Sequence, residues 1–496
     1  MIAHLPILQV VVPLLSAPVC VVLRRHNPVW VLVFLASWTA FFIAVLLLNA
    51  VSRAGEIHYV LGGWDPPWGI EYRLDVLSAY LLLIVTAIGA VVISFARESV
   101  IREISSDRIY LFYTAYLLNL AGLLGVITTG DVFNMFVFIE ISSLSSYALI
   151  SLGRDRLALL AAYRYLVLGT IGATFFLIGV GLLYVMTGTL NIVDLRARLT
   201  DVEHTRTIVT ALAFLTVGIS LKFALFPLHF WLPGAYTFAP SVVSVFLAST
   251  TTKVYIYVMI RFLYSVFNPA FVFDVISLDL VFLVCALLAI FSGSLNAIRQ
   301  NDVKCMMAYS SIAQIGYMIL GVSLVSVTGL LAGIIHLFNH ALMKGALFMC
   351  LACVFYKTGS VRLGDLRGIG RRMPWTMAAF VVAGLSLVGI PLTVGFISKW
   401  YLVLAAIERD WWWLVAAVIA GSLLAVVYIW RVVETAYFRD SDDAKSPARA
   451  EVAEAPLSML IPLWAMIAAN LYFGIDTSLT IGLAEQAANY LLGAGP

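Results

Sequence analysis

The chain has 496 residues, of which 62% are hydrophobic and only 11% are charged. Soluble proteins carry charges at about a quarter of their positions, so this composition excludes a soluble globular protein and indicates a chain embedded in a lipid bilayer. The net charge of +3 is too small to predict a nucleic-acid partner.

Apolar stretches recur along the whole chain, and about 20 helical residues are enough to cross a hydrocarbon core about 30 Å thick. We therefore predict an all-α polytopic membrane protein with about 14 transmembrane helices. They are expected at residues 5–23, 29–51, 75–96, 109–129, 131–152, 158–187, 207–226, 241–265, 274–297, 303–323, 326–355, 375–404, 411–436 and 455–475. The first span lacks a basic leader and a cleavage site, so we expect it to be retained. The weaker stretch 476–494 is expected to lie along the surface.

Residues 55–75, between the second and third spans, alternate like a β-strand around Pro66 and Pro67, which predicts a short hairpin. Basic residues gather in the loops after odd-numbered spans, and basic loops face the cytoplasm. They are Arg24, Arg25, Arg97, Arg102, Arg108, Arg154, Arg156, Arg299, Lys304, Lys357, Arg362, Arg367, Arg371, Arg372, Arg439, Lys445 and Arg449. This distribution predicts a multi-pass protein of the cell membrane, with the hairpin and both termini on the extracytoplasmic side.

Ionisable side chains inside the spans are the main functional candidates, because a charge in hydrocarbon costs at least a few kcal/mol. An ion pair between Glu140 and Lys222 would lower this cost and would, in the simplest case, only fix helix packing. The number of such groups resembles a proton relay instead, since a buried lysine can change its protonation state in response to a neighbouring charge. The relay candidates are Glu140, Lys222, Lys253 and Lys399, with His336, His340 and Lys344 as a connecting path.

Two patterns have the spacing of a metal or redox site. Cys350 and Cys353 lie within an apolar run, and we interpret them as small apolar helix residues. His336 and His340 share one helix face, but no third ligand is evident. We therefore expect no metal and no cofactor, and we interpret the histidine pair as part of a polar, hydrated track.

Helix-breaking residues interrupt two of the spans. Pro227 follows Lys222 in the seventh span, and the sequence Gly389-Ile390-Pro391 precedes Lys399 in the twelfth. Broken helices at membrane depth are tolerated where they line a cavity or lie buried in protein, and paired breaks indicate a transporter built from repeats.

The two breaks are five spans apart, so we predict two five-helix repeats, spans 4–8 and 9–13. Because five is odd, the second repeat is inverted. The predicted divisions are 1–108 with the external hairpin, 109–265 for the first repeat, 274–436 for the inverted second repeat, and 455–496 for the last span and tail.

The interrupted spans resemble those of the antiporter-like membrane subunits shared by respiratory complex I and Mrp-type sodium/proton antiporters. The resemblance covers nearly the whole chain. Its motifs are "FIEISSLSSYALI" around Glu140, "LKFALFPLHFWLPGAYTFAP" around Lys222, "TTKVYIYVMIR" with Lys253, "RQNDVKCMMAYSSIAQIGYMILG", "HLFNHALMKGALF" and "GIPLTVGFISKW" with Lys399. The hairpin sequence "LGGWDPPWGIEYRLDVLSAY" is most similar to Mrp-type D subunits.

The chain departs from relatives at three positions. In the sixth span Arg164 replaces a frequent lysine, and because arginine stays protonated it is expected to modulate a relay without joining it. Gly234 stands where some relatives have an acidic residue. Lys399 stands where one complex I paralogue type has glutamate.

The resemblance implies a proton-translocating subunit of a multisubunit Mrp-type antiporter that exchanges Na⁺ or another monovalent cation for protons. Protons would enter a half-channel in one repeat, cross the relay, and leave by a half-channel in the other. The expected partners are other membrane subunits.

Two alternatives remain. One is the proton-pumping membrane subunit of an NADH:quinone oxidoreductase (complex I) or a hydrogenase-type complex, and the other is a purely structural scaffold. The sequence has no nucleotide-, cluster- or haem-binding motif, so we expect a transport subunit that does not itself carry electrons.

Overall fold

Each apolar stretch forms a helix, because the bilayer offers no water to satisfy free backbone N–H and C=O groups. The computed structural model describes residues 4–439 and 453–493. Thirteen helices in these residues are long and apolar enough to cross a membrane, and two shorter helices, α16 (Pro374–Val388) and α17 (Val394–Ile407), form the remaining predicted span. The predicted all-α polytopic fold is confirmed. Lys445 and Arg449, assigned above to a basic loop, lie outside the described residues.

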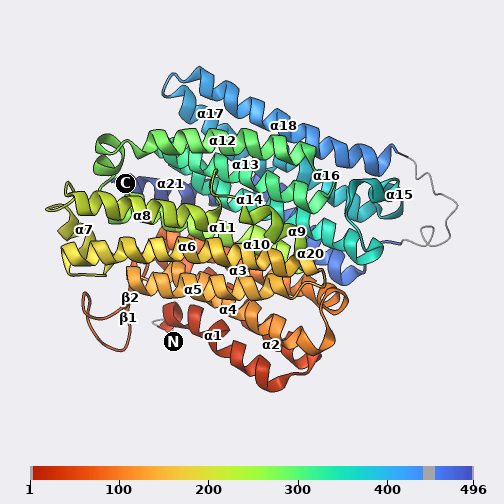
Figure 1. The fold of residues 1–496 in the computed structure, drawn as a ribbon, viewed down its shortest axis with the longest axis horizontal. Coiled ribbons are helices and arrows are strands. Elements are labelled where there is room, and N and C mark those ends of the chain that lie inside the picture. Colours follow the sequence, from red (N-terminus) through yellow and green to blue (C-terminus); the bar gives the residue numbers. More distant parts are fainter. Residues whose placement is uncertain (1–3, 440–452, 494–496) are drawn as a thin grey trace.

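The chain begins with two helices on one edge of the bundle, followed by a hairpin and by a third helix that runs inside the bundle (Figure 1). The elements are α1 (Leu5–Leu23), α2 (His26–Ala54), β1 (Ile57–Val60), β2 (Glu71–Leu74) and α3 (Val76–Glu103). The strands pair antiparallel with Tyr59 opposite Tyr72, which confirms the predicted hairpin. The hairpin is fastened to the bundle, because the N–H of Gly130, between α4 and α5, donates to the carbonyl of Glu71 over 2.9 Å.

The next five spans contain the first interruption. The elements are η2 (Ser106–Arg108), α4 (Ile109–Thr128), α5 (Val132–Ser151), α6 (Arg156–Thr187), α7 (Ile192–Leu199), α8 (Arg206–Phe223), α9 (Trp231–Phe238), α10 (Ser241–Ser249), α11 (Thr251–Arg261), η3 (Phe262–Val266) and η4 (Phe271–Val275). The expected seventh span to residue 226 is slightly too long. Helix α8 ends at Phe223, because Ala224 takes a left-handed conformation with φ 60°.

The following five spans contain the second interruption, five spans after the first. The elements are α12 (Leu278–Arg299), α13 (Val303–Ser323), α14 (Val327–Thr358), η5 (Leu363–Leu366), α15 (Ile369–Arg372), α16, α17 and α18 (Trp412–Tyr437). The chain closes with α20 (Leu457–Ile475) and α21 (Ser478–Leu492). Helix α21 lies against α3 and α14 and buries residues that include Leu483 and Ala487, while its other face is exposed.

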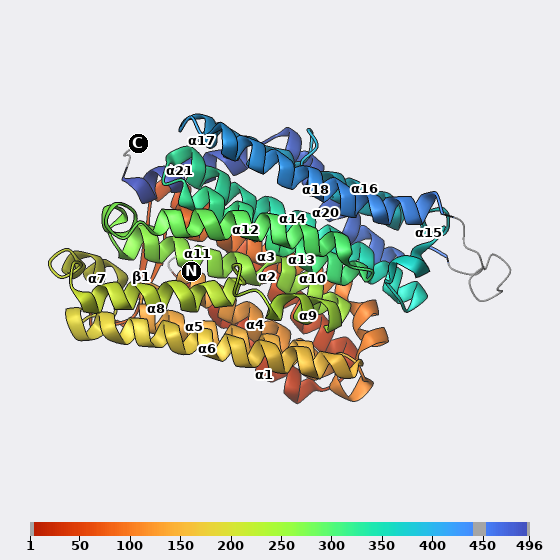
Figure 2. The ribbon, with the colours of Figure 1, turned by 45° about the horizontal axis from the view of Figure 1, so that its top comes forward.

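Helix α14 forms the centre of the molecule. It packs against α10 and α3 on one side and against α13, α16, α17, α20 and α21 on others. Figures 1 and 2 show it in the middle of the bundle, with α6 and α8 on one flank and α18 on the opposite one. Every residue from Gly329 to Val354 is buried, so this helix has no face toward lipid.

The bundle has two distinct ends. The hairpin end carries β1, β2, α7 and the start of α3, and the basic end carries the loops that contain Arg24, Arg154 and Arg362 (Figure 1). These ends give a common reference for the polar groups described below.

Candidate functional site

The predicted ion pair between Glu140 and Lys222 is present. Lys222 lies in the last turn of α8, and its ammonium donates to Glu140 Oε1 on α5 over 3.1 Å. The lysine side chain is only 2% exposed, whereas the glutamate side chain is 25% exposed. One partner is therefore fixed inside the protein while the other lies at its margin.

Three further side chains, which the sequence did not single out, complete the surroundings of Lys222. Its ammonium also donates to Ser143 Oγ over 2.8 Å, and the Tyr255 hydroxyl lies 3.1 Å from Ser143 Oγ and 3.0 Å from Ser142 Oγ. Ser142 itself donates to the carbonyl of Ile139 over 2.9 Å. With Lys222 charged, one hydrogen arrangement satisfies all these groups: Ser143 donates to Tyr255, which donates to Ser142.

The break between α8 and α9 brings Lys222 to this place. The α8 helix ends immediately after the lysine, and a helix end leaves carbonyl groups without helical partners. The indole N–H of Trp231 donates to the carbonyl of Leu221 over 2.8 Å, and the N–H of Leu225 donates to the carbonyl of Ser220 over 3.0 Å. Because these groups cap the break, the Lys222 ammonium is free to bind side chains.

Lys253 lies at a second discontinuity, between α10 and α11. Its ammonium is fully buried and donates to the carbonyl of Ala248 near the end of α10, and Thr252 Oγ1 lies 3.4 Å away. The C-terminus of a helix carries partial negative charge, which stabilises a nearby cation. Lys253 has no carboxylate partner among the described residues.

The three side chains predicted to connect the relay along α14, His336, His340 and Lys344, are all buried. His336 lies 2.7 Å from Ser398 Oγ and 3.1 Å from Gln314 Oε1, and its ring stacks on His340 with 6.0 Å between centroids. Neither ring nitrogen of His340 has a hydrogen-bond partner within the described residues. Lys344 donates to the carbonyl of Met307 over 2.8 Å and to Ser310 Oγ.

Lys399 binds the break in the twelfth span directly. Its ammonium donates to the carbonyls of Leu387 and Val388, each over 2.9 Å, at the C-terminal end of α16. The ammonium also lies 5.0 Å from the centre of the Tyr317 ring, which suits a cation–π contact. Gly389 at this turn has φ 96°, a conformation that glycine adopts without strain.

Two direct contacts between the predicted groups are present in the described residues, the Glu140–Lys222 ion pair and the stacked rings of His336 and His340. Lys253, Lys344 and Lys399 bind backbone carbonyls and hydroxyls instead. No hydrogen bond in the described residues connects Lys222 with Lys253. Tyr255, two residues beyond Lys253 on α11, contacts Ser143, which binds Lys222. Serines and tyrosines are common in membrane helices, so only their hydrogen bonds between α5 and α11 distinguish these residues.

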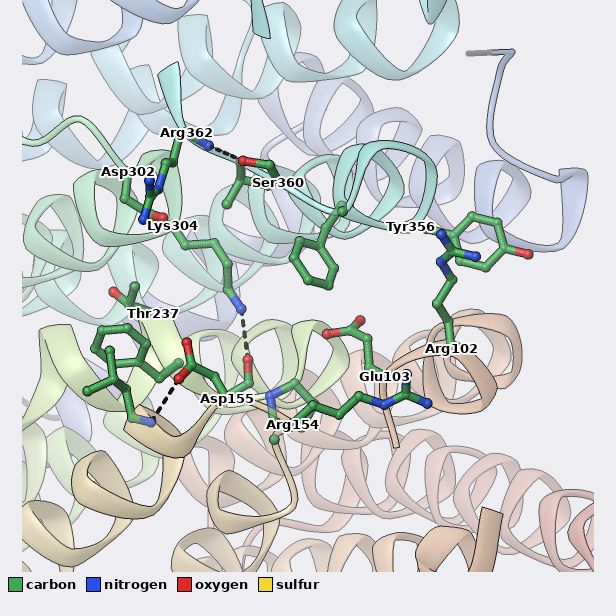
Figure 3. Close-up of a pocket in the computed structure, with 18 of the residues that line it drawn as sticks. Arg102, Glu103, Arg154, Asp155, Thr237, Asp302, Lys304, Tyr356, Ser360 and Arg362 are labelled. Carbon is green, nitrogen blue, oxygen red and sulfur yellow. Dashed lines mark hydrogen bonds between the residues drawn. The ribbon is translucent and has the colours of Figure 1, made fainter. Parts of the chain in front are cut away.

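A large cavity with both charged and apolar lining opens at the basic end. It has a volume of about 870 Å³ and is lined by helix ends and loops from five parts of the chain, including Glu103, Arg154 and Lys304 (Figure 3). Lys304 is buried and donates to the carbonyl of Ala239 over 2.8 Å, and Glu103 accepts from the N–H of Ser241 over 2.8 Å. The cavity therefore reaches the start of α10, whose other end contacts Lys253.

The remaining candidates lie apart from these groups. Arg164 lies on an exposed face of α6. Cys350 and Cys353 are free thiols buried in α14, as expected of apolar helix residues. Sequence reasoning missed a buried ion pair at the hairpin end, Asp75 with Arg261, because it treated both residues as ends of spans.

Residues 129–425, more than half of the chain and including every relay candidate, match the family model described as NADH:quinone oxidoreductase/Mrp antiporter, TM. The chain belongs to this family. It is 41% identical over 478 residues to the N subunit of the NADH-quinone oxidoreductase from Desulforudis audaxviator, covering 93% of this chain and 94% of the relative. It is 30% identical over 494 residues to the D subunit of the Na⁺/H⁺ antiporter from Alkalihalophilus pseudofirmus, covering 99% and 97%.

Solved structures show the same architecture. A chain of the membrane-bound sulfane sulfur reductase, an archaeal respiratory membrane complex, superposes with a TM-score of 0.90 at 31% identity, covering 99% of this chain and 98% of that one. A chain of the Mrp complex from Dietzia sp. DQ12-45-1b gives a TM-score of 0.89 at 27% identity, with the same coverage. Both neighbours belong to multisubunit membrane complexes.

Proposed function

We propose that this family member is the proton-translocating subunit of a multisubunit Mrp-type antiporter that exchanges Na⁺ or another monovalent cation for protons. The observation that carries the proposal is the Lys222 ammonium, held by a carboxylate at the protein margin and by a buried hydroxyl. Such a group can lose one partner and keep the other. The full-length similarity to the antiporter chain of Alkalihalophilus pseudofirmus supports an antiporter as the complex to which this chain belongs.

In this mechanism protons enter from the cavity at the basic end, because its polar lining extends to the start of α10. Separation of Glu140 from Lys222 changes the field at Lys253, which then passes a proton along the His340 and His336 face of α14. Lys399 takes the proton from this face and releases it toward the hairpin end. Each step moves one proton between buried groups and forms no covalent bond.

The charge distribution supports an orientation with the basic end in the cytoplasm. The hairpin and both termini then lie on the extracytoplasmic side of the cell membrane. We further propose other membrane subunits of the same complex as lateral partners. The exposed Arg164 on α6 and the partly exposed Glu140 side chain support this proposal, because charged groups facing lipid are costly unless protein or water covers them.

A second candidate function is the proton-pumping arm of a redox-driven complex. The 41% identity to a chain of a quinone oxidoreductase and the similarity to a sulfane sulfur reductase chain favour it. In that case the relay is the same, and electron transfer in other subunits drives it. Mass spectrometry of the copurified complex decides between the two: small membrane subunits alone support the antiporter, and iron–sulfur or flavin subunits support the redox-driven pump.

The relay itself is tested in membrane vesicles that contain the assembled complex, with a pH-sensitive dye and either Na⁺ or an electron donor as the driver. Lys222→Ala and Glu140→Ala should each abolish proton movement, because each removes one side of the pair. Lys357→Ala, at the end of α14 and outside the relay, serves as the matched control and should transport normally. Full transport by both relay variants at normal assembly would falsify the proposal.

A further inference from the structure

Helix α11 carries a stripe of polar side chains from the middle of the bundle to the hairpin end. Lys253, Tyr257 and Arg261 are spaced four residues apart, so they lie on one face of the helix. All three are buried. A stripe of this kind is a potential route for protons from the central lysine toward the hairpin end, in addition to the route along α14.

The outer end of this stripe is occupied by a buried ion pair. The Arg261 guanidinium donates to Asp75, the N-cap residue of α3, and to Ser78 Oγ over 2.8 Å, and the side chains of Arg261 and Asp75 are each 10% exposed. Ser78 also donates to the Asp75 carboxylate through its backbone N–H and its hydroxyl, each over 2.9 Å. Both charges therefore have several partners that fix them in place.

Tyr257 lies on the same helix face, between Lys253 and Arg261, and contacts the ion pair. Its hydroxyl donates to the carbonyl of Ile127 on α4 over 2.9 Å, and its ring lies under the Arg261 guanidinium, 5.0 Å from ring centre to Cζ. An arginine does not release its proton under physiological conditions, so it cannot serve as a relay group. The Arg261 guanidinium, held by Asp75, therefore interrupts the stripe with a group that can neither take up nor release a proton.

The cavities at the two ends differ accordingly. The basic end has the cavity of about 870 Å³, whereas the hairpin end has one of about 130 Å³ lined by Arg261, Asp75 and Tyr257. Arg73 narrows this smaller cavity further, because it pairs with Glu56 and donates to the hydroxyl of Tyr490 over 3.2 Å. The large cavity at the basic end lies between α3 and both five-span groups, whereas the small one at the hairpin end is lined by two ion pairs.

We propose that the Asp75–Arg261 pair is a seal that prevents protons on Lys253 from leaving at the hairpin end of the first five-span group. The inference rests on the proposed proton-translocating function. The seal forces a proton that arrives from the basic end to continue along α14 to Lys399. Without it, protons cross the membrane without driving transport.

The experiment measures passive proton leak in vesicles containing the assembled complex, with an imposed pH gradient and no driver for coupled transport. The double variant Asp75→Asn/Arg261→Gln removes both charges, so neither is left buried alone. It should collapse the gradient roughly tenfold faster than the unsubstituted chain, because the fixed ion pair that interrupts the stripe is replaced by two neutral side chains. Arg196→Gln, which removes another arginine lining the same small cavity, is the matched control and should leave the rate unchanged.

A third variant checks the route of the leak. Lys253→Ala, added to the double variant, should return the leak to the unsubstituted rate, since the stripe then lacks its inner group. An assembled double variant with the unsubstituted leak rate overturns the seal, and so does a leak that persists when Lys253 is replaced.

Ser78→Ala provides a second test if the double variant does not assemble. It removes one hydrogen bond of Arg261 and keeps both charges, so a smaller rise in leak is expected, and an unchanged rate counts against the seal. The relay is tested separately in the same vesicles by measuring driven proton transport with Lys222→Ala. Normal driven transport by this variant would contradict the relay and not the seal.

Discussion

Lys222 has two partners that differ in how easily they can leave. Glu140 is a charged side chain at the margin of the protein, whereas Ser143 is fully buried and is held in turn by Tyr255. If the carboxylate moves away, the hydroxyl still accepts a hydrogen bond from the ammonium. The serine therefore fixes the position of the amine and contributes to the stability of its protonated form.

Ser143→Ala should shift the pH profile of driven proton transport to more acidic pH. The protonated amine loses one of its two acceptors, and a hydrogen bond to a charged group contributes enough free energy for a shift of about one pH unit. The rate is measured against pH in vesicles that contain the assembled complex. Tyr255→Phe should cause a smaller shift in the same direction, because it removes only the group that orients Ser143.

Ser145→Ala is the matched control for this prediction. Its hydroxyl lies on the same helix and donates only to the carbonyl of Ile141, over 2.7 Å. The idea is wrong if Ser143→Ala and Ser145→Ala give the same profile as the unsubstituted chain.

At the scale of elements, the two interrupted spans are completed in different ways. The indole of Trp231 caps the end of α8, which leaves Lys222 available to side chains, whereas Lys399 itself caps the end of α16. The lysine of the first break is thus free to switch partners, and the lysine of the second holds the broken helix together. Lys399 has a structural duty in addition to its proposed place in the relay.

Replacing Lys399 should separate these two duties. Lys399→Met leaves the carbonyls of Leu387 and Val388 without partners, which destabilises the fold by about 1–3 kcal/mol for each buried group. Lys399→Arg keeps hydrogen-bond donors but cannot release a proton, so it should retain stability and lose transport. Thermal unfolding of the purified complex and transport in vesicles measure the two effects. Normal transport by the arginine variant would remove Lys399 from the relay.

Most elements were predictable because the bilayer restricts what a chain can do. Both interruptions followed from Pro227 and from the Gly389–Pro391 sequence, and the Glu140–Lys222 pair followed from the cost of an isolated charge in lipid. Helix α7 was missed, because it has only eight residues and lies in a polar connection. The contacts of Tyr255 and the pairing of Asp75 with Arg261 depend on how distant helices pack, which spacing along one helix does not reveal.

At the scale of the whole molecule, the polar groups differ between the two ends. The basic end has loops with many arginines around a large cavity, and the hairpin end has a small cavity lined by two ion pairs. This asymmetry distinguishes the two ends of the molecule across the membrane. The proposed orientation assigns the large cavity to the cytoplasm and the hairpin to the extracytoplasmic side.

Single cysteines should report this orientation. Trp68 in the hairpin is 90% exposed, and Gly364 at the basic end has open space around its α-carbon, so a thiol at either position is accessible. A membrane-impermeant maleimide should label Trp68→Cys in intact cells and Gly364→Cys only in inverted vesicles. The unsubstituted chain, whose own cysteines include the partly buried Cys285 and Cys305, gives the background. The reverse pattern would invert the proposed direction of proton entry.

The complete burial of α14 has a consequence for how a chain of this kind can change over evolution. A substitution on the exposed outer face of α1 or α2 has no packed neighbours within this chain, so a range of apolar shapes can be accommodated there. A change of volume between Gly329 and Val354 meets packed protein on every side and must be matched by a neighbouring residue. Single substitutions can therefore accumulate on the outer faces of α1 and α2. Changes within α14 require a second, compensating substitution in a neighbouring helix.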